Sequence, residues 1–155
     1  MQEQKTSRSE PEYEMLKQGD VMVPSRDGTL LATDVYLPSS GGNPVSGPIP
    51  TVMERTPYDK QAPGRAETAL YFASRGYVAV IQDCRGTFES EGDQEFLIPE
   101  AEDGFDTMEW ISNQSWSNGK VGSWGCSWAS WTQTAMAGLG AKDLAAMVPN
   151  MSGSN

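Results

Sequence analysis

Hydrophobic and polar positions divide the first fifty residues of this chain into two strand-like runs and two polar segments. Residues 20–24 and 30–37 are rich in apolar side chains, and a turn containing Asp27 and Gly28 separates them. This pattern predicts an N-terminal antiparallel hairpin at one edge of a sheet. Residues 1–18 contain few apolar side chains and predict a flexible lead-in to a domain over 19–155. Residues 38–50 are rich in Pro, Gly and Ser and predict a loop.

Beyond residue 50, apolar runs of strand length alternate with segments of helical spacing. The run at 77–82 is almost continuously apolar, which is typical of a strand buried on both faces of a parallel sheet. Alternating elements favour right-handed crossovers, so we predict an α/β fold with a mostly parallel sheet and helices on both faces. The predicted strands are 51–55, 77–82, 120–126 and a further buried strand at 144–149; the predicted helices are 66–74, 99–113 and 127–138.

The carboxyl ends of parallel strands form the edge at which such folds place their chemistry. Three segments are expected there: the loop after Arg55, the loop after Gln82 and the turn that contains Ser127. These segments hold the candidate functional residues.

Ser127 lies between a predicted strand and a predicted helix, as the nucleophile of a hydrolase elbow does. Gly125 and Ala129 are small, which suits a tight turn, although the fifth position of the usual motif is Gly. In this position the backbone N–H of Trp128 would stabilise an oxyanion that forms beside Ser127. One alternative is that Ser127 only caps the helix. Another is a loose dinucleotide-binding loop, whose glycine spacing this sequence fits poorly.

Tyr58 follows a predicted strand, and Pro57 before it restricts the backbone. Its hydroxyl is a candidate oxyanion donor, and the alternative is an ordinary surface tyrosine. The loop after Gln82 is rich in carboxylates, but it shows no regular metal-ligand spacing. We expect Asp83 and Arg85 to pair and shape that loop, and we predict no metal and no cofactor.

Composition and charge exclude several functions. The net charge is −10, whereas nucleic acids and anionic membranes require a basic face, so we predict neither as a partner. No apolar run approaches the ~18 residues of a membrane helix. The polar N-terminus does not resemble a secretory signal, which favours the cytoplasm; the alternative is a secreted form whose signal has been removed. Two cysteines, Cys84 and Cys126, are expected to be small buried hydrophobic residues. The chain contains no histidine.

Several stretches, in series, resemble the X-Pro dipeptidyl-peptidase-like hydrolases, the group that includes cocaine-esterase-type and α-amino-acid ester hydrolases. They cover about residues 20–155 and read RDGTLLATDVYLP, ERTPYDK, FASRGYVAVIQDCRGTFESEG, DGFDTMEWISNQSWSNGKVGSWGCSW and LAAMVPNMSGS. The resemblance implies an α/β-hydrolase fold with Ser127 as nucleophile, and an oxyanion hole made by the Tyr58 hydroxyl and the Trp128 backbone N–H. The family usually has Tyr, Gly and Gly at positions 128 to 130, where this chain has Trp128, Ala129 and Ser130.

In this family the aspartate and histidine of the triad lie well downstream of the elbow. The resemblance therefore implies that the chain is the N-terminal part of a catalytic domain whose last strands, with the Asp and His, belong to a missing C-terminal remainder. We predict a serine hydrolase that cleaves a small ester, amide or short peptide through an acyl-enzyme on Ser127, and that is inactive without a histidine. The alternative is a truncated, non-catalytic hydrolase-like protein that binds a partner.

Overall fold

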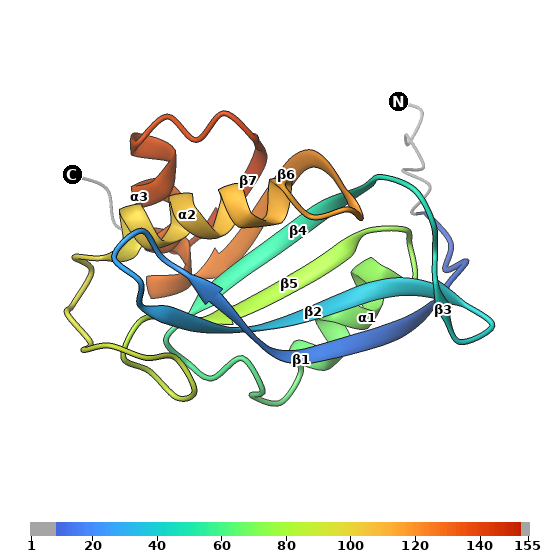
Figure 1. Cartoon of the computed structure of the whole chain (residues 1–155), viewed down its shortest axis with the longest axis horizontal. Helices are drawn as coiled ribbons and strands as arrows, with labels where there is room; N and C mark the ends of the chain where they lie inside the picture. Colours follow the sequence, from blue (N-terminus) through green and yellow to red (C-terminus); the bar gives the residue numbers. More distant parts are fainter. Residues whose placement is uncertain (1–8, 153–155) are drawn as a thin grey trace, which may run out of the picture.

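The computed structural model describes residues 9–152, and within them seven strands form one sheet that three helices cover (Figure 1). The strands are β1 (Glu14–Pro24), β2 (Leu30–Ser40), β3 (Asn43–Pro44), β4 (Ile49–Thr56), β5 (Val78–Asp83), β6 (Ser117–Cys126) and β7 (Leu144–Asn150). The helices are α1 (Arg65–Ala73), α2 (Glu100–Ser112) and α3 (Trp128–Gly138). None of these helices is long and apolar enough to cross a membrane.

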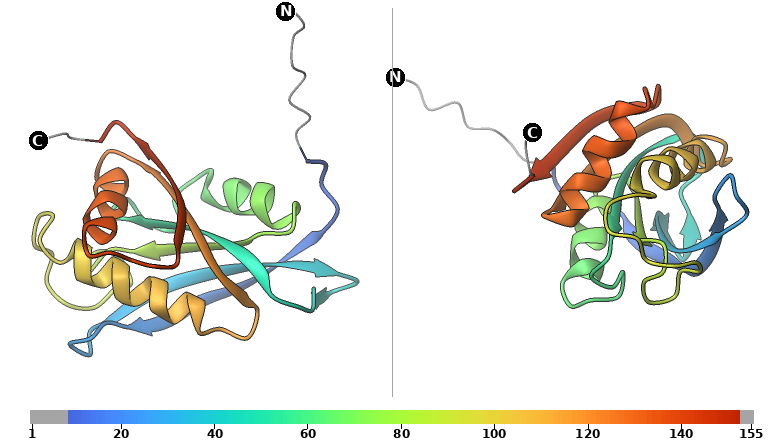
Figure 2. Two further views of the ribbon diagram at one scale, coloured as in Figure 1. Left: turned by 90° about the horizontal axis from the view of Figure 1, so that it is seen from above. Right: turned by 90° about the vertical axis from the view of Figure 1, so that its left-hand side faces the viewer.

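The sheet has the order β1-β2-β5-β4-β6-β7, with the short β3 paired to β2. β1 and β2 form the predicted antiparallel hairpin, and β2 also pairs antiparallel with β5. The pairs β5–β4, β4–β6 and β6–β7 are all parallel. Figure 2 shows α1 on one face of this sheet and α2 and α3 on the other. The predicted α/β fold is confirmed.

Alternate side chains of the central strand β5 supply the two halves of the core. Val78 and Val80 pack in the larger cluster, together with side chains of α2 and α3. Ala79 and Ile81 face the opposite way and pack against the α1 side. Every residue of β5 is buried, as its continuous apolar run predicts. This rigid centre holds the carboxyl ends of β4, β5 and β6 at one edge.

The hairpin is longer than its apolar pattern indicates. β1 begins at Glu14, so the prediction of a flexible lead-in is wrong for residues 14–18, which pair with β2. Most side chains of β1 are exposed, and backbone pairing alone extends the strand without an apolar signal. Residues 9–13 belong to no helix or strand, and residues 1–8 lie outside the described residues. The loop predicted at 38–50 is also too long, because it contains the end of β2, the whole of β3 and the start of β4.

The last strand, β7, is not buried as predicted. It lies at the edge of the sheet beyond β6, and all of its residues except the first are exposed. Its apolar sequence therefore faces solvent in the described part of the chain. The strand predicted at 120–126 begins three residues earlier, since Ser117, Asn118 and Gly119 also belong to β6.

Candidate active site

The three segments predicted to share an edge of the sheet do meet there. Tyr58 follows the end of β4, and Ser127 lies between β6 and α3. Because β4 pairs in parallel with β6, the two strands deliver these residues to the same place. The Tyr58 hydroxyl lies 3.3 Å from the Ser127 hydroxyl. Both side chains are exposed at this edge.

Ser127 occupies a strained turn. Its backbone has φ 59° and ψ −120°, a conformation that is rare for any residue other than glycine. The turn is held by its neighbours, since the Ser127 N–H donates to the Asn150 carbonyl at 2.9 Å. The Ser127 side chain makes no capping hydrogen bond to α3, so the capping interpretation is wrong. The hydroxyl is instead directed to the surface beside Tyr58.

Gly125 makes the tight turn sterically possible. Its φ is +154°, and a Cβ atom built on it would lie 2.5 Å from the Ala129 carbonyl oxygen. The same Cβ would lie 2.7 Å from the Ala129 Cβ. The small residues at 125 and 129 thus serve the close approach of strand and helix, and not a dinucleotide.

Two hydrogen-bond donors converge beside the Ser127 hydroxyl. The Trp128 backbone N–H donates to the Tyr58 hydroxyl oxygen at 3.4 Å, and that hydroxyl donates to Ser127 Oγ. Both bonds are long. A substrate carbonyl oxygen that displaced these two contacts would accept hydrogen bonds from the phenol O–H and the backbone N–H together. The structure thus brings the three residues singled out from the sequence into one cluster.

A buried lysine anchors the loop that carries Tyr58. The Lys60 N–H donates to Asp83 Oδ1 at 2.7 Å, and Lys60 Nζ lies 2.8 Å from Asp20. Burial alone would lower the pKa of Lys60, but the hydrogen bond to Asp20 and nearby carboxylates raise it, so the ammonium stays charged. The prediction that Asp83 pairs with Arg85 is wrong. Arg85 instead contacts Asp27 and Asp103, which tie the loop after β5 to the hairpin turn and to α2.

Sequence reasoning missed a second buried group beneath the site. Glu100, the first residue of α2, accepts a hydrogen bond from the Trp128 indole N–H at 2.8 Å. Its other carboxylate oxygen lies 2.8 Å from the Arg55 guanidinium, and both side chains are fully buried. Acidic residues are common in the first turn of a helix because they favour its dipole, so the sequence around Glu100 gives no sign that its carboxylate is buried.

A cavity of about 310 Å³ opens directly beside the nucleophile candidate. Ser127 and Tyr58 form one wall, and Phe96, Trp128 and Trp131 contribute aromatic rings. Phe96 meets Trp128 edge to face, with ring centroids 4.7 Å apart. The cavity can therefore take an apolar part of a molecule whose reactive carbonyl reaches Ser127.

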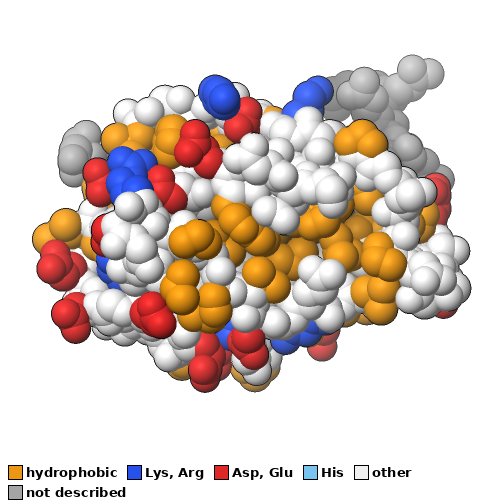
Figure 3. Space-filling view, in the orientation of Figure 1, with side chains coloured by type: hydrophobic (Ala, Val, Ile, Leu, Met, Phe, Trp, Pro, Cys, Tyr) orange, Lys and Arg blue, Asp and Glu red, His pale blue; other side chains and the backbone are white. Residues whose placement is uncertain are grey.

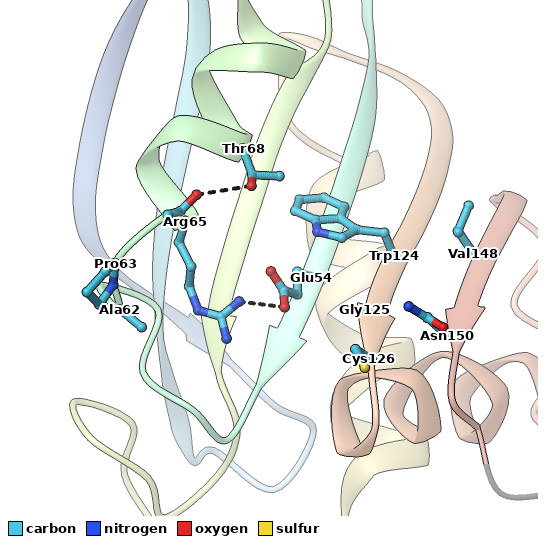
Figure 4. A pocket seen from close by; sticks show the side chains of 11 residues that line it. Glu54, Ala62, Pro63, Arg65, Thr68, Trp124, Gly125, Cys126, Val148 and Asn150 are labelled. Carbon is cyan, nitrogen blue, oxygen red and sulfur yellow. Dashed lines mark hydrogen bonds and ion pairs between the residues drawn. The ribbon is translucent and has the colours of Figure 1, made fainter.

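A larger hollow of about 520 Å³ lies on the α1 side of the sheet, between α1 and the ends of β6 and β7 (Figure 4). Ser127 does not line it. Its polar lining includes the Glu54–Arg65 ion pair, Cys126 and Asn150. Cys126 is exposed, so the expectation that both cysteines are buried holds only for Cys84. Across residues 9–152 no group of three or more His, Cys, Asp or Glu side chains is arranged to hold a metal ion.

The sheet order, the helices on both faces and the strained serine turn define an α/β-hydrolase fold. Comparison with known proteins agrees. Residues 27–155 match the family model described as X-Pro dipeptidyl-peptidase (S15 family), and the chain belongs to that family. The cocaine esterase of Rhodococcus sp. (strain MB1 Bresler) is 40% identical over 136 residues, which are 85% of this chain and 23% of the esterase.

Solved structures give the same result. An α-amino acid ester hydrolase superposes with a TM-score of 0.73 at 32% identity, covering 88% of this chain and 25% of that one. A CocE/NonD family hydrolase from Staphylococcus aureus has a TM-score of 0.76 at 30% identity, covering 88% and 27%. The chain thus spans about a quarter of the length of these relatives. The predicted family and hydrolase class are confirmed.

Proposed function

We propose that this chain supplies the nucleophile and the oxyanion hole of a serine hydrolase that cleaves esters or amides. The observation that carries the proposal is the cluster at the sheet edge. A strained, exposed serine lies 3.3 Å from a tyrosine hydroxyl, which in turn lies 3.4 Å from the backbone N–H of the next residue. Core packing does not account for the position of Tyr58 in the loop after β4, since 47% of its surface is exposed.

In the proposed reaction, Ser127 Oγ attacks the substrate carbonyl carbon while a general base accepts its proton. The carbonyl oxygen becomes an oxyanion, which the Tyr58 O–H and the Trp128 N–H stabilise by hydrogen bonds. The intermediate then collapses, and the leaving alcohol or amine takes the proton back from the base. Water repeats these steps on the acyl-enzyme, which releases the acid and restores Ser127.

The base must come from outside residues 1–155, because this sequence contains no histidine. We infer that further polypeptide, carrying an aspartate and a histidine, pairs with the exposed β7 edge and covers the hollow of Figure 4. Two observations support this: the relatives are about four times as long, and β7 exposes six of its seven residues. An uncovered apolar edge strand is otherwise prone to association.

The surface at the candidate site favours a neutral or cationic small molecule or short peptide as substrate. Figure 3 shows acidic side chains at the end of the molecule where the loop between β5 and α2 lies. This loop exposes four carboxylates, Glu89, Glu91, Asp93 and Glu95. With the net charge of −10, they repel anionic substrates and give no support to a nucleic-acid or membrane partner.

The test is hydrolysis of p-nitrophenyl acetate by the polypeptide encoded by the complete gene. We expect Ser127→Ala to lower kcat by up to about 10⁶-fold. Tyr58→Phe, which removes one oxyanion donor, should cost about 10²- to 10³-fold. Tyr71→Phe is the matched control, since Tyr71 is similarly exposed but lies on α1. Full activity in the Ser127→Ala protein would refute the proposed nucleophile.

The 155-residue chain alone should be nearly inactive. Robust hydrolysis by this chain, lost on Ser127→Ala, would show that no external base is needed. The alternative function, a non-catalytic hydrolase-like binding protein, is favoured by the missing histidine. A stop codon after Asn155 in the gene, together with substrate binding but no turnover, would support that alternative.

A further inference from the structure

A single buried carboxylate connects the two segments that hold the oxyanion donors. Glu100 is 1% exposed and uses both of its carboxylate oxygens. Oε2 lies 2.8 Å from Arg55 on β4, the strand that leads to Tyr58. Oε1 accepts the indole N–H of Trp128, the first residue of α3, also at 2.8 Å. The strand and the helix that carry the two donors are therefore tied to one side chain.

The Arg55 end of this connection is rigid. Its guanidinium is completely buried, and its Nε–H donates to Gln82 Oε1 at 2.7 Å on the neighbouring strand β5. One of its terminal nitrogens also donates to the Glu100 backbone carbonyl at 3.0 Å. Burial alone would lower the pKa of Arg55, but the charge of Glu100 is the largest of the effects that raise it. The guanidinium therefore stays charged and holds Glu100 in place.

The Trp128 end is fixed at two points. The indole N–H is held by Glu100, and Phe96 packs edge to face against the ring. The backbone N–H of this same residue is the donor that faces Tyr58. A side chain fixed in this way restricts the backbone to which it is attached, and here that backbone is half of the oxyanion hole.

We propose that Glu100 is a positioning residue that sets the spacing between the Tyr58 hydroxyl and the Trp128 backbone N–H. Stability alone is a weak reason for such a pair, because buried ion pairs often contribute little compared with apolar residues of the same volume. What the arrangement does provide is one fixed geometry between two elements. The catalytic consequence rests on the proposed hydrolase function, but the positioning itself does not.

The chain contains a matched control for this connection. Trp131 lies one turn further along α3 and also lines the cavity beside Ser127. Its indole N–H donates to the Leu97 backbone carbonyl at 3.3 Å, not to a buried carboxylate. Replacement of either tryptophan by phenylalanine removes one indole donor and retains an aromatic ring. Only the substitution at 128 removes the hydrogen bond to Glu100.

The experiment is a double-mutant cycle read by NMR on the ¹⁵N-labelled 155-residue chain. In the wild-type background, Tyr58→Phe should shift the amide proton of residue 128, because it removes that amide's acceptor. In the Trp128→Phe background most of this shift should be lost, since the amide no longer faces residue 58. In the Trp131→Phe background the shift should persist. Equal shifts in all three backgrounds would overturn the proposal.

A second variant tests Glu100 itself. Glu100→Gln keeps an acceptor oxygen for the indole, whereas Glu100→Leu keeps none. The Gln variant should therefore retain more of the Tyr58-dependent shift than the Leu variant. Equal retention in the two would overturn the role of the carboxylate. If Glu100→Leu does not fold, Trp128→Phe supplies the same comparison without a buried charge left unpaired.

Activity of the complete polypeptide separates this proposal from the proposed function. Trp128→Phe should lower kcat about 10-fold with little change in KM, a smaller effect than the loss of a whole donor. If Ser127→Ala leaves activity intact, the hydrolase proposal fails while the NMR cycle still decides the positioning. If the cycle shows no coupling, the positioning proposal fails whatever the activity.

Discussion

Substitution of Gly125 by alanine tests the steric basis of the serine turn. Two costs arise. A φ of +154° disfavours any residue with a Cβ, at about 1–3 kcal/mol. The added Cβ would also lie 2.5 Å from the Ala129 carbonyl oxygen, a backbone atom that cannot rotate away. Overpacking of this kind costs about 1–3 kcal/mol more. We therefore expect Gly125→Ala to lower the free energy of unfolding by about 2–6 kcal/mol.

Gly119→Ala is the matched control, because Gly119 lies in the same strand, β6, with φ +75° and no atom within 4 Å of the built Cβ. It incurs the conformational cost but not the overlap. Urea unfolding followed by circular dichroism should show Gly125→Ala less stable than Gly119→Ala by about 1–3 kcal/mol. Thermal midpoints should differ in the same order, by about 2–4 °C per kcal/mol.

A difference below about 0.5 kcal/mol between the two variants would refute the steric account, since it would mean that α3 moves away from β6 at little cost. In that case the Tyr58-dependent shift of the Trp128 amide proton should change in Gly125→Ala. An unchanged shift together with equal stabilities would show that the turn does not depend on a glycine at this position.

Four further measurements follow from the structure. Ser127→Gly should be more stable to urea than Ser127→Ala by about 1 kcal/mol, because glycine relieves the strained φ; equal stabilities would argue against strain. Arg55→Met should lower the free energy of unfolding by about 3–5 kcal/mol, since it leaves the buried Glu100 carboxylate without its cation, and a loss under 1 kcal/mol would contradict this. One thiol, Cys126, should react rapidly with Ellman's reagent in the folded chain, whereas Cys84 should react only on unfolding, because burial raises its pKa and blocks access; Cys126→Ser should remove the fast phase. Burial raises the pKa of Glu54 above 4.5, so the folded state binds its proton more tightly and stability falls as pH rises from 4.5 through the folded pKa; Glu54→Gln should remove this part of the pH dependence in urea titrations.

The sequence was most informative where a local pattern and a tertiary role coincide. The apolar run of β5 predicts burial on both faces, and both faces are covered by helices. The turn at Ser127 could also be predicted from the sequence. Small residues around a serine between a strand and a helix are required by the close approach of the two elements. Tyr58 was less so. Its position after a strand indicated the edge but not the partner, and the family resemblance supplied its role.

Contacts between residues that are distant in the sequence could not be predicted from the local hydrophobic pattern. Glu100 follows a proline at a helix start, where an acidic residue is common on any surface helix, and nothing local shows that it is buried. Its partners lie 45 and 28 residues away in the sequence. Residues 14–18 were missed because edge-strand pairing uses backbone groups, which every sequence has. The prediction for β7 failed in the opposite way: its apolar residues suggested burial, but six of its seven residues are exposed in the structure.

The site divides into a part that this chain holds rigidly and a part that it leaves open. Ser127 is fixed on one side by the Asn150 carbonyl of β7, and its own carbonyl accepts the N–H groups of Ser130 and Trp131 at the start of α3. The nucleophile candidate and its two donors therefore have their geometry before any further polypeptide is added. Within residues 9–152, the Ser127 side chain is exposed and the outer edge of β7 pairs with no further strand. A polypeptide that pairs with β7 would reach the carboxyl end of the sheet next to Ser127, which is where the proposed hydrolase needs its base.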